Sequence, residues 1–364
     1  MIDWHSSMQQ TFEFYKVDPN TWMDSELINT VNSATINRDL NADTLGSATF
    51  DIDGSIDECY IRVYIRVSQN GDVERHPLGT FLVQTPTYTY NGRKSKYTLD
   101  AYTPLLELKE NPMPLGYSLL KGTNIMESAY RIARDGARAP VIKPENNDTL
   151  NDDFVAETSD TKLNFITDLI SNANNRLDLD EMGRIAFAPV IETDKLQPSE
   201  IFNDDNSSIL LPDISVTNDI FGIPNSVTVV YSKNKIYYEK TITNDDPNSV
   251  LSTVNRGRVI EIRDEDPNLY GLASEAMIEE YAKKLLKQKS KVSRTITFSH
   301  GFLPNIRIGD CIELNYERAG IRNKKAQIVS QSIECKQGCI INETAIYTDS
   351  LWEGWNQWHW LIIY

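Results

Sequence analysis

The sequence of 364 residues has few cysteines and no long apolar run. Its four cysteines include no C-x-x-C pair, and Cys335 and Cys339 flank a predicted hairpin turn, so neither a disulfide framework nor a metal site is indicated. No apolar stretch approaches the roughly 20 residues that a bilayer-spanning helix needs. The first residues also lack the basic and then apolar pattern of a secretory signal. We therefore expect a protein that is made in the reducing cytoplasm and has no membrane partner.

Histidines and recognisable catalytic motifs are also scarce. None of the four histidines lies at metal-binding spacing from another histidine or cysteine, and His76 and His300 are expected in exposed turns. There is no G-x-S-x-G, Walker lysine loop or G-x-G-x-x-G. Residues 178–183 imitate the start of a calcium loop, but Met182 and Pro189 occupy ligand positions, so a β-turn ending at Gly183 is predicted. The sequence thus predicts no catalytic, cofactor-binding or metal-binding residue and no cofactor.

Positive charge is in deficit. The chain has 36 Lys and Arg against 52 Asp and Glu, a formal net charge of −16. Such a surface repels the phosphate backbone, which disfavours nucleic-acid binding by counterion release. The same repulsion allows an acidic wall to surround DNA without gripping it. We therefore expect no sequence-specific nucleic-acid binding.

The first hundred residues have the pattern of short β-strands. Apolar and polar residues alternate along 57–67, which predicts a strand with Ile61 and Val63 buried and Arg62 on a solvent-facing side. A second strand is predicted at 78–83, and Asn91-Gly92 predicts a tight hairpin turn. Short strands with a turn signal about every ten residues are typical of a small barrel or sandwich.

The middle of the chain has helical patterns and the last third returns to strands. Asn124 is a predicted N-cap for a helix that ends at Gly136, a second helix fits 161–174, and the longest helix is predicted over 269–288. The predicted fold class is α+β, mostly β, with two small antiparallel β-barrel-like domains around an α+β domain. The predicted divisions are 1–109 for the first β domain, 110–205 for the α+β domain, 206–350 for the second β domain with a helix-containing insertion around 233–290, and 351–364 for a terminal segment.

Tryptophan is concentrated at the C-terminal end. Four of the six tryptophans fall within the last 14 residues, and an end this aromatic is costly to leave in water. It either folds back on the core of its own chain or anchors a neighbouring subunit, since tryptophan is enriched at interface hot spots. The candidate interface residues are Trp352, Trp355, Trp358 and Trp360.

Two groups of short motifs resemble a known family. The first is LGTFLVQTP at 78–86 followed by YTLDAYTPLLEL at 97–108; the second is IPNSV at 223–227, TNDDPNS at 243–249, STV at 252–254 and GR at 257–258. Their order resembles baseplate hub and tail-tip proteins of tailed bacteriophages and related contractile injection systems. The resemblance covers about residues 45–350.

The resemblance implies a structural protein of the virion tail. It implies a homotrimer in which two tail-tube-like domains per chain imitate the six-fold tail tube, present three-fold symmetry to a spike or central fibre, and let DNA pass. The implied partners are the tail tube or distal tail ring protein and the spike or fibre, with the tape measure protein as a further candidate. Two alternatives stay open: a hub-like protein with cell-wall hydrolase activity, and a tail protein that binds host-surface carbohydrate through the terminal tryptophans.

Overall fold

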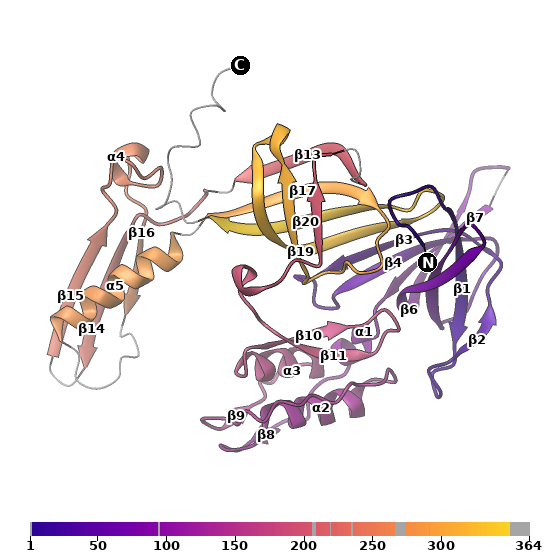
Figure 1. The fold of residues 1–364 in the computed structure, drawn as a ribbon. Helices are drawn as coiled ribbons and strands as arrows, with labels where there is room; N and C mark the ends of the chain where they lie inside the picture. The colour runs from indigo at the N-terminus through magenta and orange to yellow at the C-terminus, as the bar shows by residue number, and fades with distance from the viewer. Residues whose placement is uncertain are drawn as a thin grey trace. The chain divides into compact units, whose positions relative to one another are not determined.

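The computed structural model describes residues 2–93, 95–205, 209–218, 220–233, 236–265, 274–290 and 292–349 (Figure 1). Strands account for 47 % and helices for 16 % of the described residues, so this part of the chain is mostly β, as predicted. The chain divides into two compact units. Unit 1 comprises residues 1–214 and 297–345, and unit 2 comprises 215–296 and 346–364. The four-part domain division predicted from the sequence stays a prediction.

The N-terminal third consists of antiparallel strands. The turn predicted at Asn91-Gly92 is confirmed, because two strands meet around it and Gly92 has a φ of 85°. A buried apolar cluster that includes Ile36, Phe50 and Leu99 forms between these strands. The strands are β1 (Gln9–Val17), β2 (Asp24–Leu27), β3 (Val31–Asp39), β4 (Gly46–Ile52), β5 (Tyr60–Gln69), β6 (Asp72–Tyr90) and β7 (Ser95–Tyr102).

Helices follow, gathered with short strand pairs in Figure 1. The helix predicted after Asn124 is confirmed: the Asn124 side chain accepts a hydrogen bond from the Glu127 backbone N–H at 2.8 Å. The helix predicted at 161–174 is also present, and its buried face includes Phe165 and Ile166. The elements are α1 (Leu105–Glu110), β8 (Ser118–Leu119), α2 (Ile125–Gly136), β9 (Phe154–Val155), α3 (Lys162–Ser171), β10 (Asn175–Leu179), β11 (Ile185–Pro189) and the 3₁₀ turn η1 (Thr193–Lys195).

The C-terminal strands belong to the same sheet as the N-terminal ones. The first half of β19 pairs with β18, and its second half pairs with β3, from Ser330 opposite Asp39 to Cys335 opposite Ala34. One 13-stranded sheet results, with the path β13-β17-β20-β19-β3-β4-β7-β6-β5-β1-β2, and the described residues contain no closed barrel. Its further strands are β12 (Glu200–Asn203), β13 (Leu210–Asn218), β17 (Val292–Gly301), β18 (Cys311–Tyr316), β19 (Ile321–Cys335) and β20 (Ile340–Asp349), with the 3₁₀ turn η2 (Glu317–Ala319) between β18 and β19.

Unit 2 is a three-stranded sheet packed against one long helix. Strand β14 pairs antiparallel with β15 and parallel with β16. Helix α5 buries Ile278 and Leu286 against Val227 and Val229 of β14. Glu279 on the same helix accepts from Lys283 at 2.7 Å and from a lysine of β15 at 2.9 Å. The elements are β14 (Ser226–Lys233), β15 (Ile236–Thr243), α4 (Thr253–Arg256), β16 (Glu261–Glu265) and α5 (Glu275–Lys289). Helix α5 confirms the predicted helix of 269–288 from Glu275 onward; Ser274 is its N-cap, and 269–273 lie outside the described residues.

Strand β5 differs from the sequence prediction of a half-buried strand. Tyr60 to Ile65 are all buried, and only Arg66 among the next residues is exposed. Ile61, Val63 and Ile65 belong to the cluster between the strands, whereas Tyr60 belongs to the cluster around helices α1–α3. The prediction was wrong because a second layer, built from the helical part of unit 1, covers the face that the alternation marked as polar. Arg62 is therefore an interior residue.

Candidate functional site: an internal joint and two exposed surfaces

The turn between β10 and β11 is inserted against the N-terminal strands. The β-turn predicted for residues 178–183 is confirmed, with Gly183 at a φ of 74°. The Met182 carbonyl accepts from the Trp22 indole N–H at 2.8 Å and from Arg62 at 3.0 Å. A Cβ on Gly183 would lie 2.6 Å from the Thr80 Cβ, so only glycine fits here without displacement. The turn is thus held both by its backbone shape and by donors from the opposite layer.

We call the contact between the turn of residues 178–183 and the strands around Arg62 and Arg38 the joint. Arg62 is its central hydrogen-bond donor. Its side chain is 1 % exposed, and its Nη1 lies 2.8 Å from an Asp24 carboxylate oxygen. Its Nε donates to the Thr80 hydroxyl at 2.9 Å, and its Nη2 also reaches the Trp22 carbonyl at 3.2 Å. Asp24 accepts a further bond from the Tyr64 hydroxyl at 2.7 Å. Burial, and secondarily this bond to Asp24, raises the pKa of Tyr64. The guanidinium therefore donates hydrogen bonds to four different groups, which its planar array of N–H donors allows.

A second arginine holds the same turn from the side of the C-terminal strands. Arg307 donates to an Asp178 carboxylate oxygen at 2.8 Å and to the Leu179 carbonyl at 2.6 Å. Glu181 lies between Arg307 and Arg38, 3.8 and 3.9 Å from their nearest nitrogens. Arg62 of β5 and Arg307 of the β17–β18 loop thus bind the same turn.

A buried polar chain continues from Arg38 across the sheet. Arg38 donates to Gln331 at 2.7 Å, and Gln331 donates to Glu343 at 2.7 Å. His300 lies at the end of the chain, with Nε2 3.2 Å from the same Glu343 oxygen. The prediction that His300 lies in an exposed turn is wrong: it is fully buried, because β17 and β20 bring it against Glu343. The prediction is also wrong for His76, which is half-buried and lies within strand β6.

The contacts of His300 fix how many protons it shares with Glu343. Nδ1 lies 2.6 Å from the Gly301 carbonyl, which only accepts, so we assign a proton to Nδ1. The contact between Nε2 and Glu343 then needs one further proton, either on the ring or on the carboxyl group. The second Glu343 oxygen has no hydrogen-bond partner. Both side chains are inaccessible to solvent, so this pair belongs to the interior of the sheet rather than to a substrate site.

The hollow at the joint is small. Its volume is about 40 Å³, which accommodates a few waters at most, and Arg38, Thr80, Asp178 and Arg307 are among its lining residues. A wider hollow of about 410 Å³ lies between the loop after β3 and helix α3, and none of its lining residues is aromatic. Within the described part of the chain, no three His, Cys, Asp or Glu residues are grouped to hold a metal, and no helix is long and apolar enough to cross a membrane.

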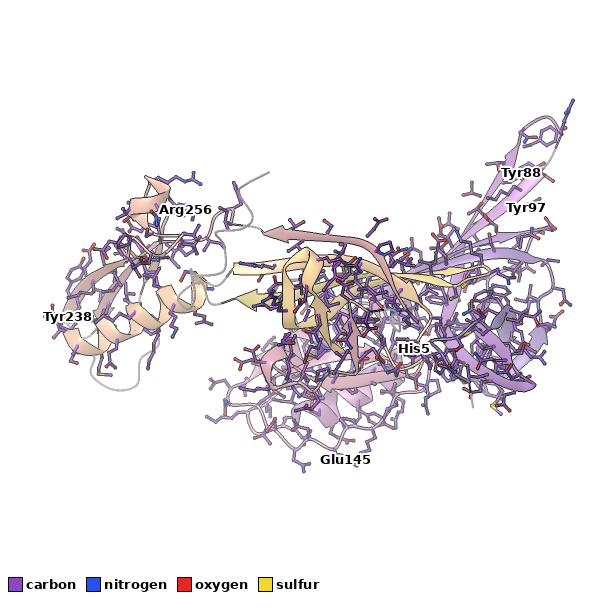
Figure 2. The ribbon with its side chains drawn as sticks, turned by 45° about the horizontal axis from the view of Figure 1, so that its top comes forward. His5, Tyr88, Tyr97, Glu145, Tyr238 and Arg256 are labelled. Atoms are coloured by element: carbon purple, nitrogen blue, oxygen red, sulfur yellow. The ribbon has the colours of Figure 1, made fainter. Side chains whose placement is uncertain are left out.

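The first exposed surface is the outer half of the β6–β7 hairpin. From Thr85 to Tyr90 every residue of β6 is exposed, on both faces of the strand. Figure 2 shows Tyr88 and Tyr97 on this hairpin where it extends beyond the sheet. Their rings lie 4.9 Å apart, and Tyr90 at the tip is 63 % exposed. A hairpin that exposes aromatic side chains to solvent on both faces is a candidate contact surface.

The second exposed surface is the outer face of the β8–β9 pair. Ser118 pairs with Val155 and Leu119 with Phe154, so Val155 lies on the face opposite the buried Leu119, and the exposed Leu120 directly follows β8. Leu120 is 66 % and Val155 is 59 % exposed.

The four tryptophans predicted as interface residues, Trp352, Trp355, Trp358 and Trp360, lie outside the described residues. The joint residues Arg38, Arg62 and Gln331 were missed by sequence reasoning. The alternation that marked Arg62 as solvent-facing carries no signal that a second layer covers it. Trp22, with a φ of 58° that non-glycine residues seldom adopt, also shows its role only in the structure.

The fold matches two solved tail proteins over nearly the whole chain. A tail protein from Neisseria meningitidis MC58 is 14 % identical with a TM-score of 0.64, and the match covers 94 % of this chain and 98 % of that one. The 43 kDa tail protein of prophage MuSo2 from Shewanella oneidensis is 10 % identical with a TM-score of 0.59, covering 92 % and 97 %. No family model and no curated protein sequence matches. The resemblance to phage tail proteins inferred from the sequence motifs is therefore confirmed, at the level of the fold.

Proposed function

We propose that this chain is a structural protein of a phage tail, a homotrimeric baseplate or tail-tip hub that joins the six-fold tail tube to a three-fold spike or central fibre. The observation that carries the proposal is the match to two tail proteins, one of them from a prophage, along more than nine tenths of the chain. Its working location is then the virion tail, and its partners are the tube or distal tail ring, the spike or fibre and the tape measure protein.

The construction of unit 1 suits such a role. Its N-terminal and C-terminal strands join in one sheet, and the arginine-held turn of residues 178–183 fixes the helical layer against that sheet. Contacts that fix one layer against the other favour a rigid body, which suits a protein that joins two partners. In the proposed ring, the N-terminal and C-terminal strands act as the two tube-like domains of each subunit.

The acidity of the chain supports passage of DNA through the proposed ring. With a net charge of −16, attraction between the wall and the phosphate backbone is disfavoured. A non-enzymatic role is part of the proposal. The two alternatives stay open, because the tryptophans of the carbohydrate alternative lie outside the described residues and no acid pair was named for the hydrolase alternative.

The proposal is tested by the mass of the purified full-length chain in solution, measured by light scattering over a range of concentrations. We expect a species of three times 41.4 kDa and a three-fold ring in negative-stain electron microscopy. A chain that ends at residue 350 tests whether the tryptophan-rich segment holds the ring. A monomer at every concentration that also cleaves peptidoglycan, or that binds host polysaccharide, would contradict the proposal.

A further inference from the structure

The β6–β7 hairpin has a charge opposite to that of the chain as a whole. Residues 84–98 contain three basic residues, Arg93, Lys94 and Lys96, and no acidic residue, in a protein with 16 more acidic than basic residues. Lys96 is paired with Asp51 at 2.8 Å, whereas Arg93 is exposed near the tip. The tip therefore presents a cation beside Tyr88 and Tyr90. Tyrosine and arginine are the residue types most enriched at the centres of protein interfaces.

The tip of the hairpin has little to stabilise it within its own subunit. Beyond Leu82, the described pairing of β6 is with β7, and β7 also pairs with β4 from Tyr97 onward, so the two-stranded part is Thr89–Tyr90 opposite Ser95–Lys96. A two-stranded ribbon exposed on both faces is at best marginally stable in water. A partner that covers the tyrosines would remove apolar surface from water and complete the ribbon.

The outer face of β8–β9 has the complementary chemistry. Leu120 and Val155 form its exposed apolar centre. Residues 118–121 and 152–157 beside it contain three acidic residues, Asp152, Asp153 and Glu157, and one basic residue, the exposed Lys121. Asp153 accepts from the Lys121 backbone N–H at 2.7 Å, which fixes one carboxylate at the edge of the face. An apolar centre with an acidic rim fits an aromatic hairpin with a basic tip.

We propose that the β6–β7 hairpin of one subunit docks on the β8–β9 face of a second copy of this chain. Both surfaces belong to unit 1. Figure 2 shows Tyr88 and Tyr97 at the opposite side of that unit from Glu145, which belongs to the loop that leads to β9. The hairpin therefore does not reach the β8–β9 face of its own subunit. Such a contact joins unlike patches and closes into a ring when repeated around a rotation axis. The proposal rests on the self-assembly proposed above and names the surfaces that carry it.

The direct test is photo-cross-linking from the hairpin tip in the full-length chain. A benzophenone amino acid replaces Tyr90, and equal amounts of isotope-labelled and unlabelled protein are mixed before irradiation. We expect cross-links between the two isotopic forms that map to residues 115–157. Cross-links to other regions, cross-links confined to one isotopic form, or none at the highest soluble concentration would overturn the proposal.

A charge swap tests the electrostatic part of the contact. Arg93→Glu is expected to weaken self-association about tenfold, because it places like charges together at the rim. Asp152→Arg in the same chain is expected to restore most of the loss. Lys287→Glu, an equal charge change on an exposed helix residue of unit 2, is the control and is expected to change little. Equal effects of Arg93→Glu and Lys287→Glu, or no recovery in the swap, would overturn the proposal.

The outcomes separate this inference from the proposed function. A trimer whose cross-links map elsewhere refutes the docking site and leaves the hub proposal standing. Cross-links to 115–157 in a dimer or an open chain support the docking site and refute the trimeric hub. Binding of the hairpin to single-stranded nucleic acid, with no effect of Arg93→Glu on self-association, would refute the docking site and point to base stacking instead.

Discussion

Replacement of Arg62 by methionine tests whether one buried side chain holds the two layers of unit 1 together. Methionine keeps most of the apolar volume but removes the four polar contacts to Asp24, Thr80, Trp22 and the Met182 carbonyl. Breaking a buried ion pair by removing one partner costs about 3–5 kcal/mol. Asp24 is 23 % exposed and keeps its hydrogen bond from Tyr64. We therefore expect Arg62→Met to lower the free energy of unfolding by about 3 kcal/mol, the lower end of this range.

Arg66→Met is the matched control on the same strand. Its side chain is 53 % exposed and its nearest carboxylate oxygen, on Glu13, is 3.9 Å away, so we expect a loss of about 0.5 kcal/mol or less. The measurement is hydrogen exchange of peptides from 60–69 and 175–189, because local opening reports on this joint even where the chain unfolds in several steps. Faster exchange of both peptides in Arg62→Met alone is the expected result. Equal protection in the two variants would refute the reasoning.

A double-mutant cycle adds a check on the cause. Asp24→Asn in the Arg62→Met background removes the carboxylate that has lost its partner. We expect the double variant to regain about 1 kcal/mol relative to the sum of the two single losses. Simple additivity would show that the joint depends on packing rather than on the ion pair.

Three further predictions follow from other sites. Gly183→Ala is expected to lower the free energy of unfolding in urea by about 2–4 kcal/mol, because the φ is left-handed and the new Cβ would lie against Thr80. The control Gly122→Ala has a φ of 82° but open space around it, so we expect a loss of about 1 kcal/mol. Equal losses in the two variants would contradict the predicted clash. The two lysine partners of Glu279 lower its pKa to about 2, so its stabilising effect is present above the ordinary pKa of 4.5 and is lost as the pH falls toward 2. The difference in helix stability between wild type and Glu279→Gln, followed by circular dichroism, is therefore expected to vanish near pH 2. A difference that stays constant with pH would contradict this prediction. Burial raises the pKa of both Cys335 and Cys59, but Cys335 is buried whereas Cys59 is partly exposed, so maleimide is expected to label Cys59 first; the reverse order in mass spectrometry would contradict the packing.

Local signals in the sequence determined much of the secondary structure. Asn91-Gly92 fixes a hairpin because both residue types tolerate the backbone of a tight turn, and Asn124 fixes the start of α2 because its side chain replaces a missing backbone acceptor. Residues 178–183 form a turn because Gly183 adopts a positive φ at low cost. Such features depend on a few neighbouring residues, so a single sequence contains them. The order of short motifs also indicated the phage tail fold.

The placement of layers was decided only in the tertiary structure. Alternation along β5 correctly marked Ile61 and Val63 as buried, but it carries no information about what covers the opposite face, so Arg62 was assigned to solvent. His300 was assigned to an exposed turn for the same reason, because Glu343 lies 43 residues away and reaches it only through strand pairing. The union of the N-terminal and C-terminal strands in one sheet depends on β19 changing its partner from β18 to β3. Contacts between residues far apart in the chain are set by the sum of many weak packing terms, which no short pattern encodes.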